Sequence, residues 1–91
     1  MDYKEYFIEL ISGFLDKKYS RSEIAQKITN NIGVDEIKGN HDDLLVNCEI
    51  ALRHIDHEGY YTSENELKYY LSCLKNEKKF NEKERNTFLK I

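Results

Sequence analysis

The chain has 91 residues, of which 40% are hydrophobic and 34% charged, with a formal net charge of −3. This length suits one domain with one modest core, and we expect residues 1–91 to form a single helical domain. Seven Tyr and four Phe exclude the disordered acidic proteins, which lack apolar surface to bury. No apolar run approaches the length of a membrane span, so we expect no membrane association.

Helices are the expected secondary structure, because the chain has no proline and only four glycines. We therefore predict an all-α fold, a small compact bundle of four to five helices. The first residues lack the basic-then-apolar order of a signal peptide, which favours a cytoplasmic location. Abundant Lys, Asn, Ile and Tyr indicate an AT-rich bacterial genome.

The first predicted helix covers residues 2–18, where apolar side chains recur at three- and four-residue spacing. Gly13 lies inside that pattern and would allow a close helix crossing. The second helix opens with a capping box, Ser20 with Glu23, and ends at Gly33, a natural left-handed stop.

A third helix is predicted after Asp42 or Asp43, ending at Gly59. A second capping box, Ser63 with Glu66, opens the fourth helix. Both helices carry apolar residues at helical spacing, which predicts one buried stripe on each.

A short last helix is predicted over about residues 81–90, opened by Asn81 and frayed at the chain end. Residues 34–40 are expected to form a loop in which Val34 and Ile37 close the base of the core. No segment alternates apolar and polar residues, so no strand is predicted.

Cys48 and Cys73 are 25 positions apart and lack Cys-x-x-Cys spacing. In a reducing compartment we interpret them as small apolar core residues. A disulfide, a metal site and a redox role remain alternatives.

A dense polar cluster comprises His54, Asp56, His57 and Glu58. These residue types suit acid–base chemistry or a metal, with His54 and His57 as weak candidate ligands and His41 a more distant third. The preferred interpretation is helix-end chemistry, because cations and imidazoles near a helix C-terminus pair with its last carbonyls. We therefore predict no metal, no other cofactor and no catalytic residue.

Residues 23–28 resemble the first helix of a helix-turn-helix, so DNA binding is one hypothesis. The segment that follows contains Asp35 and Glu36, which would face phosphate, and the net charge gives no basic surface. We expect no nucleic-acid partner.

Charge is distributed unevenly along the chain. Residues 41–74 carry seven acids against two Lys or Arg (−5), and residues 75–91 carry six basic residues against three acids (+3). Adjacent Tyr69 and Tyr70 cannot both face the core of an isolated helix, so one is expected to be partly exposed. The predicted partner-binding residues are Asp56, Glu58, Tyr60, Tyr61, Glu64, Glu66 and Tyr69.

These patterns favour a protein-interaction module that binds a basic protein stoichiometrically, as an adaptor, regulator or inhibitor, without turnover. One alternative is a metal-dependent or acid–base enzyme centred on His54, Asp56, His57 and Glu58. Another is a homodimer whose tyrosine face is the subunit interface.

Overall fold

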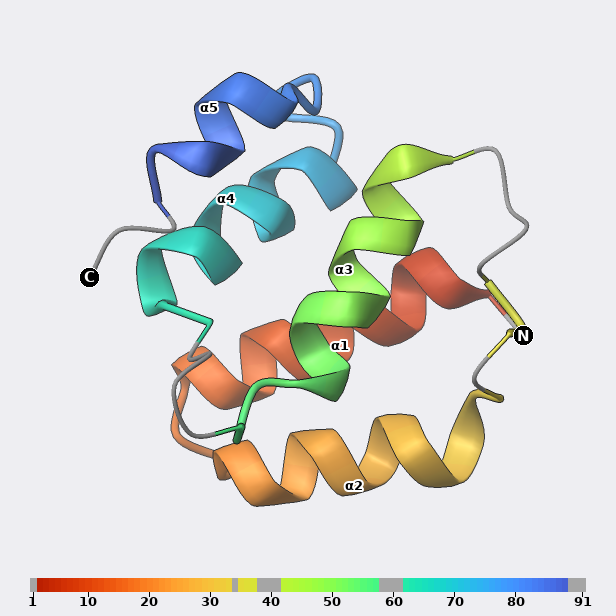
Figure 1. Ribbon diagram of the computed structural model, residues 1–91. Coiled ribbons are helices and arrows are strands. Elements are labelled where there is room, and N and C mark those ends of the chain that lie inside the picture. The colour runs from red at the N-terminus through yellow and green to blue at the C-terminus, as the bar shows by residue number, and fades with distance from the viewer. Residues whose placement is uncertain (1, 34, 38–41, 58–61, 89–91) are drawn as a thin grey trace.

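The computed structural model describes residues 2–33, 35–37, 42–57 and 62–88. These residues form five helices and no strand: α1 (Tyr3–Leu15), α2 (Arg21–Asn31), α3 (Asp43–Arg53), α4 (Glu64–Leu74) and α5 (Glu82–Asn86). In Figure 1, α1, α2 and α4 run from side to side and α3 runs across them. The predicted small all-α bundle is confirmed. No helix within the described residues is long and apolar enough to cross a membrane.

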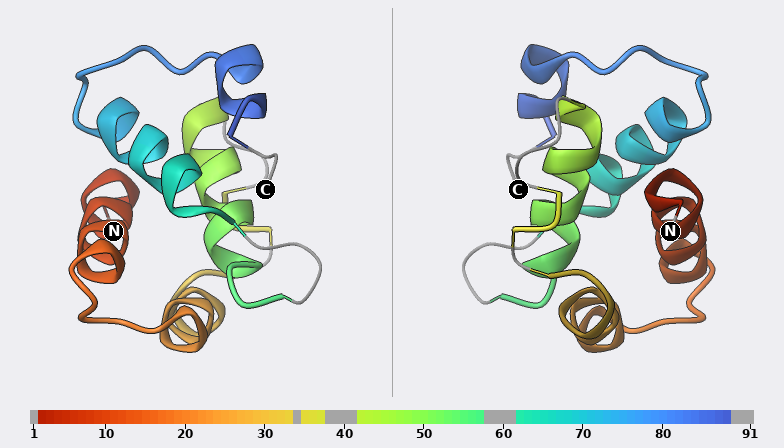
Figure 2. Two further views of the ribbon diagram at one scale, coloured as in Figure 1. Left: turned by 90° about the vertical axis from the view of Figure 1, so that its left-hand side faces the viewer. Right: turned by 90° about the vertical axis from the view of Figure 1, so that its right-hand side faces the viewer.

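The core lies between α1, α2, α3 and α4, which surround it in Figure 2. Its fully buried side chains include Phe7, Leu10, Ile11, Ile24, Ile28, Leu52, Ile55, Leu67 and Tyr70. Ile37 joins them at 1% exposure, as predicted, whereas Val34 lies outside the described residues. Cys48 and Cys73 are free thiols in this core, and burial raises the pKa of both.

Helix α1 begins after Asp2, whose carboxylate accepts the Glu5 N–H. It ends at Leu15 instead of residue 18, because Lys17 adopts a left-handed conformation with a φ of 63°. The Lys18 N–H then returns to the Gly13 carbonyl at 2.7 Å. This wrapped C-terminus turns the chain sharply toward α2.

Gly13 accommodates an aromatic ring and not a second helix. A Cβ atom at this position would lie 2.5 Å from two ring carbons of Tyr19, closer than real Cβ contacts allow. The interior glycine predicted to permit a helix crossing thus permits Tyr19 to pack onto α1 just before α2 begins.

Helix α2 carries the complete capping box that the sequence predicted. Ser20 Oγ accepts the Glu23 N–H at 3.1 Å, and the Glu23 carboxylate accepts the Ser20 N–H at 2.9 Å. The prediction for its other end is wrong: Ile32 is already extended, with a φ of −130°, and Gly33 is not left-handed. The Gly33 N–H is satisfied by the Glu36 side chain at 3.0 Å.

Two later helices are shorter than predicted. Helix α3 ends at Arg53, well before Gly59, and continues as a turn through Asp56. Helix α5 covers Glu82–Asn86 out of the predicted 81–90, after Asn81 caps it as expected. Both revisions move residues predicted on helices into connecting segments.

Candidate functional site

The predicted partner-binding residues fall into three settings. Asp56, in the turn after α3, and Glu64, the first residue of α4, are exposed. Glu66 and Tyr69 are buried. Glu58, Tyr60 and Tyr61 lie outside the described residues.

The prediction that one of the adjacent residues Tyr69 and Tyr70 is partly exposed is wrong. Tyr69 is 4% exposed and Tyr70 is fully buried, because the chain after α4 folds back over them. The Phe88 ring lies 5.3 Å from the Tyr69 ring, and the Phe80 ring lies 6.2 Å from it. Tyr69 therefore packs against the chain that follows α4 and is not presented to solvent.

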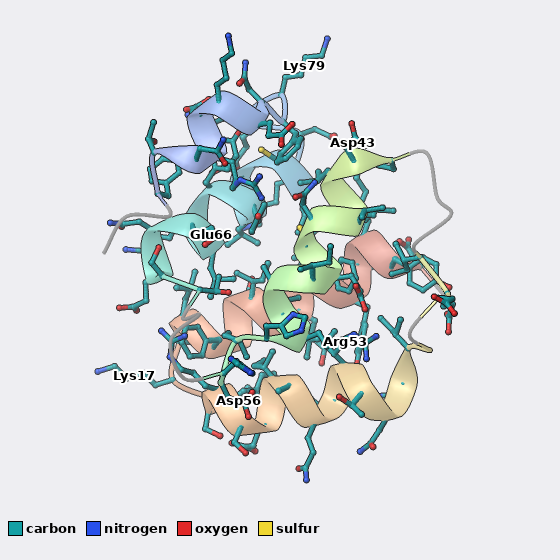
Figure 3. All side chains as sticks on the ribbon, viewed as in Figure 1. Lys17, Asp43, Arg53, Asp56, Glu66 and Lys79 are labelled. Carbon is teal, nitrogen blue, oxygen red and sulfur yellow. The ribbon has the colours of Figure 1, made fainter. Side chains whose placement is uncertain are left out.

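Glu66, labelled on α4 in Figure 3, belongs to a buried polar cluster. Only 4% of its surface is exposed. Desolvation raises the pKa of Glu66, opposed in part by the nearby Tyr70 hydroxyl and by the charge of Arg85. Desolvation likewise raises the pKa of Tyr70. The predicted surface acid is thus a member of the interior.

Arg85, on α5, completes this cluster. Its Nη1 lies 3.2 Å from Tyr70 Oη and 2.9 Å from Asn47 Oδ1, so one guanidinium joins α3, α4 and α5. No motif in the sequence predicts this role. The only available signal was an arginine in an otherwise lysine-rich segment, and arginine favours such multiple planar contacts.

Arg21 plays a corresponding role at the opposite end of the bundle. Its Nη1 donates to the Ile55 carbonyl at 3.0 Å and to the Thr62 carbonyl at 2.8 Å. It thereby holds both ends of the segment that separates α3 from α4. Its guanidinium also lies 5.1 Å from the centre of the Phe14 ring, a cation–π contact.

The histidine cluster matches the helix-end interpretation. His54 Nδ1 lies 2.9 Å from the Ile50 carbonyl, and because a carbonyl only accepts, Nδ1 carries the proton. The His54 and His57 rings meet edge to face, with centroids 6.2 Å apart. Within the described residues, no three His, Cys, Asp or Glu side chains gather where they could hold a metal ion.

Arg53, the last residue of α3, contacts the end of α2. Its Nε donates to Glu49 at 2.6 Å, and its Nη2 donates to the Ile32 carbonyl at 3.1 Å. Arg53 therefore caps the C-terminus of α2. Glu49 and Arg53 also form an ion pair one turn apart, which neutralises the only basic residue of α3.

The outward face of α3 is the most unusual described surface. Ile50, at 41% exposure, is the only large hydrophobic residue exposed among the described residues. Val46, one turn earlier, is partly buried and packs against the core. Figure 3 shows Asp43 at one end of α3 and Asp56 beyond the other. An exposed apolar side chain thus lies between acidic ends.

A separate hollow of about 520 Å³ lies between the C-terminus of α1 and the N-termini of α2 and α4. It brings Glu64 to the same site as Lys17, Lys18 and Arg21, with Glu23 also on its wall. Because acidic and basic side chains both line this hollow, it favours neither charge. Glu64 lines the hollow and Asp56 does not, so these two predicted partner-binding residues lie at different sites.

No known protein family, curated protein or solved structure matches this chain.

Proposed function

We propose that this domain acts by stoichiometric binding of a basic protein partner, without turnover, through the outward face of α3. The observation that carries the proposal is the exposure of Ile50 between acidic residues. Single exposed hydrophobic residues are common on protein surfaces. One at the centre of a helix face, bordered by charges of one sign, suits a binding site in which the apolar side chain contacts the partner and the charges attract it.

The charges of this face support a basic partner. Every charged residue that is classed as exposed between residues 42 and 57 is acidic: Asp42, Asp43 and Asp56. The one arginine there is paired with Glu49 and is largely covered. Because α3 is about 16 Å long, its two acidic ends would meet cations on either side of a central apolar contact.

The predicted anchors Tyr60 and Tyr61 belong to the same proposal, although they lie outside the described residues. They follow Asp56 closely in the chain. Replacing both with alanine should abolish partner recovery while the circular dichroism spectrum stays helical. The abundance of Lys, Asn, Ile and Tyr supports a bacterial source for the partner.

Site-specific photo-cross-linking in the native host tests the proposal. A photoreactive phenylalanine analogue replaces Ile50, and a matched control replaces Thr29, an exposed residue of α2. We expect a discrete heterologous adduct from position 50 only, and its loss when Asp43 and Asp56 are changed to lysine. No adduct from position 50, or equal adducts from both positions, would refute the proposal. An adduct of twice the chain mass would support the homodimer instead.

A further inference from the structure

Helix α5 is held against the bundle almost entirely by side chains. It has five residues and none of them is buried. An isolated helix needs about 12–15 residues to be even marginally stable in water, so α5 forms only because it is docked. Figures 1 and 2 place it over α4 and one end of α3, away from α1 and α2.

The contacts of residues 75–88, here called the C-terminal segment, are specific. The Tyr69 hydroxyl donates to the Asn81 carbonyl at 3.2 Å and accepts the Asn81 N–H at 2.7 Å. Ser63 Oγ donates to the Phe88 carbonyl at 3.0 Å. Together with Arg85, these contacts fix the segment at Asn81, at Arg85 and at its last residue, Phe88.

The surface beneath has the composition of a protein interface. Two tyrosine rings, Tyr69 and Tyr70, face Phe80 and Phe88, and the buried carboxylate of Glu66 lies close to Arg85. Tyrosine and arginine dominate the binding energy of protein interfaces, and a desolvated carboxylate demands a cation opposite it. Tyr69 and Tyr70 belong to the hydrophobic core, so removal of the segment would expose the α4 side of that core together with Glu66.

The connection to α4 allows such removal. Residues 75–79 are all exposed, and Asn76 takes the left-handed conformation, with a φ of 63°, that ends α4 independently of α5. Elements with little buried surface open locally at a lower free energy than global unfolding. The C-terminal segment is therefore the part of the described chain best suited to open by itself.

We infer that the C-terminal segment is an intramolecular ligand, covering a second docking surface formed by Asn47, Glu66, Tyr69 and Tyr70. Its external ligand is a basic segment of a partner protein in which two aromatics flank an arginine, as Phe80, Arg85 and Phe88 do here. The C-terminal segment itself indicates this chemistry, because its phenylalanine rings pack on the two tyrosines and its arginine contacts the Tyr70 hydroxyl. This inference does not depend on the binding face proposed for α3.

A labelled peptide corresponding to residues 76–88 tests the inference against the full-length chain. In the wild-type protein the tethered segment competes at an effective concentration of roughly millimolar, so the free peptide binds weakly. In the full-length Arg85→Ala variant the tethered competitor is weakened. We expect fluorescence anisotropy to show at least about tenfold tighter peptide binding to that variant. A peptide carrying Arg85→Glu should bind neither protein.

Each other outcome contradicts the inference. Equal peptide affinity for the two proteins would mean that no competed surface exists. Collapse of the helical circular dichroism signal in the variant would mean that the segment is part of the core. Hydrogen exchange on the wild-type chain provides a second measurement: the amides of residues 85–88 should exchange by local opening, and exchange only by global unfolding overturns the inference. A concentration-dependent dimer would assign the surface to a second copy's segment and not to a partner.

Discussion

Glu23 and Glu66 occupy the same position in two helices, each three residues after a capping serine, yet they do opposite things. Glu23 turns back to the Ser20 N–H, and the backbone and side-chain hydrogen bonds of Ser20 lower its pKa. Glu66 donates its own N–H to Ser63 Oγ at 3.0 Å, but its carboxylate lies buried near Tyr70 and Arg85, where desolvation raises its pKa. One local motif therefore supports two environments.

A capping motif therefore specifies the backbone at a helix start, but it does not determine where the glutamate carboxylate lies. At α2 the glutamate is exposed, and its carboxylate accepts the Ser20 N–H. At α4 the C-terminal segment covers it and supplies Arg85 and the neighbouring aromatic rings. The side chain responds to a partner located far away in the sequence.

The largest expected effect comes from Arg85→Ala. The substitution leaves Tyr70 and Asn47 without their cationic donor and Glu66 without its nearby positive charge. We expect a loss of about 2–3 kcal/mol in the free energy of unfolding, measured with urea. Lys83→Ala on the same helix is the control, because Lys83 is exposed and its loss should matter by less than about 0.5 kcal/mol. Equal effects would mean that the cluster contributes nothing specific.

Gly13→Ala tests the packing of the Tyr19 ring on α1, just before the Ser20 cap of α2. Alanine raises helix propensity by about 1 kcal/mol, but its Cβ would overlap the Tyr19 ring. We expect a net loss of about 1–2 kcal/mol, the usual result of overpacking. In a Tyr19→Ala background the same change should become stabilising. A Gly13→Ala substitution that stabilises the wild-type chain would show that the ring moves away freely.

The fold was largely predictable because its signals are local. Ser20, Ser63 and Asn81 cap the helices where short-range spacing places them, and apolar periodicity identified the buried stripes. The ends of α2 and α3 were misplaced because glycine was expected to stop helices that end earlier through tertiary contacts.

The polar cluster could not be predicted in the same way. Arg85 contacts residues 15 and 38 positions away, and no period or motif in the sequence encodes that pairing. The exposure expected for Tyr69 failed for the same reason, since an isolated helix has no C-terminal segment above it. The exposure of Ile50 was likewise missed, because a helical position alone does not reveal which face lacks a neighbour.

Replacing the two capping serines with alanine compares the helix starts directly. Each loses one cap, for about 1 kcal/mol. Ser63→Ala should cost more than Ser20→Ala, because Ser63 Oγ also donates to the Phe88 carbonyl. It should also accelerate hydrogen exchange in residues 85–88, whereas Ser20→Ala should leave those amides unchanged. If both substitutions lower the free energy of unfolding equally and neither changes hydrogen exchange, Ser63 does not contribute to the docking of the C-terminal segment.

The pH dependence of stability should differ in sign between the two glutamates. The pKa of Glu66 is raised above its ordinary 4.5, so its stabilising contribution is complete below that pH and is lost as the pH rises through the raised pKa. The pKa of Glu23 is lowered, so its contribution is present above 4.5 and is lost as the pH falls through the lowered pKa. Urea denaturation across this range should therefore show Glu66→Gln gaining stability relative to wild type as the pH rises. Glu23→Gln should lose stability relative to wild type over the same change. If both variants shift in the same direction, the burial of Glu66 beneath the C-terminal segment does not persist in solution.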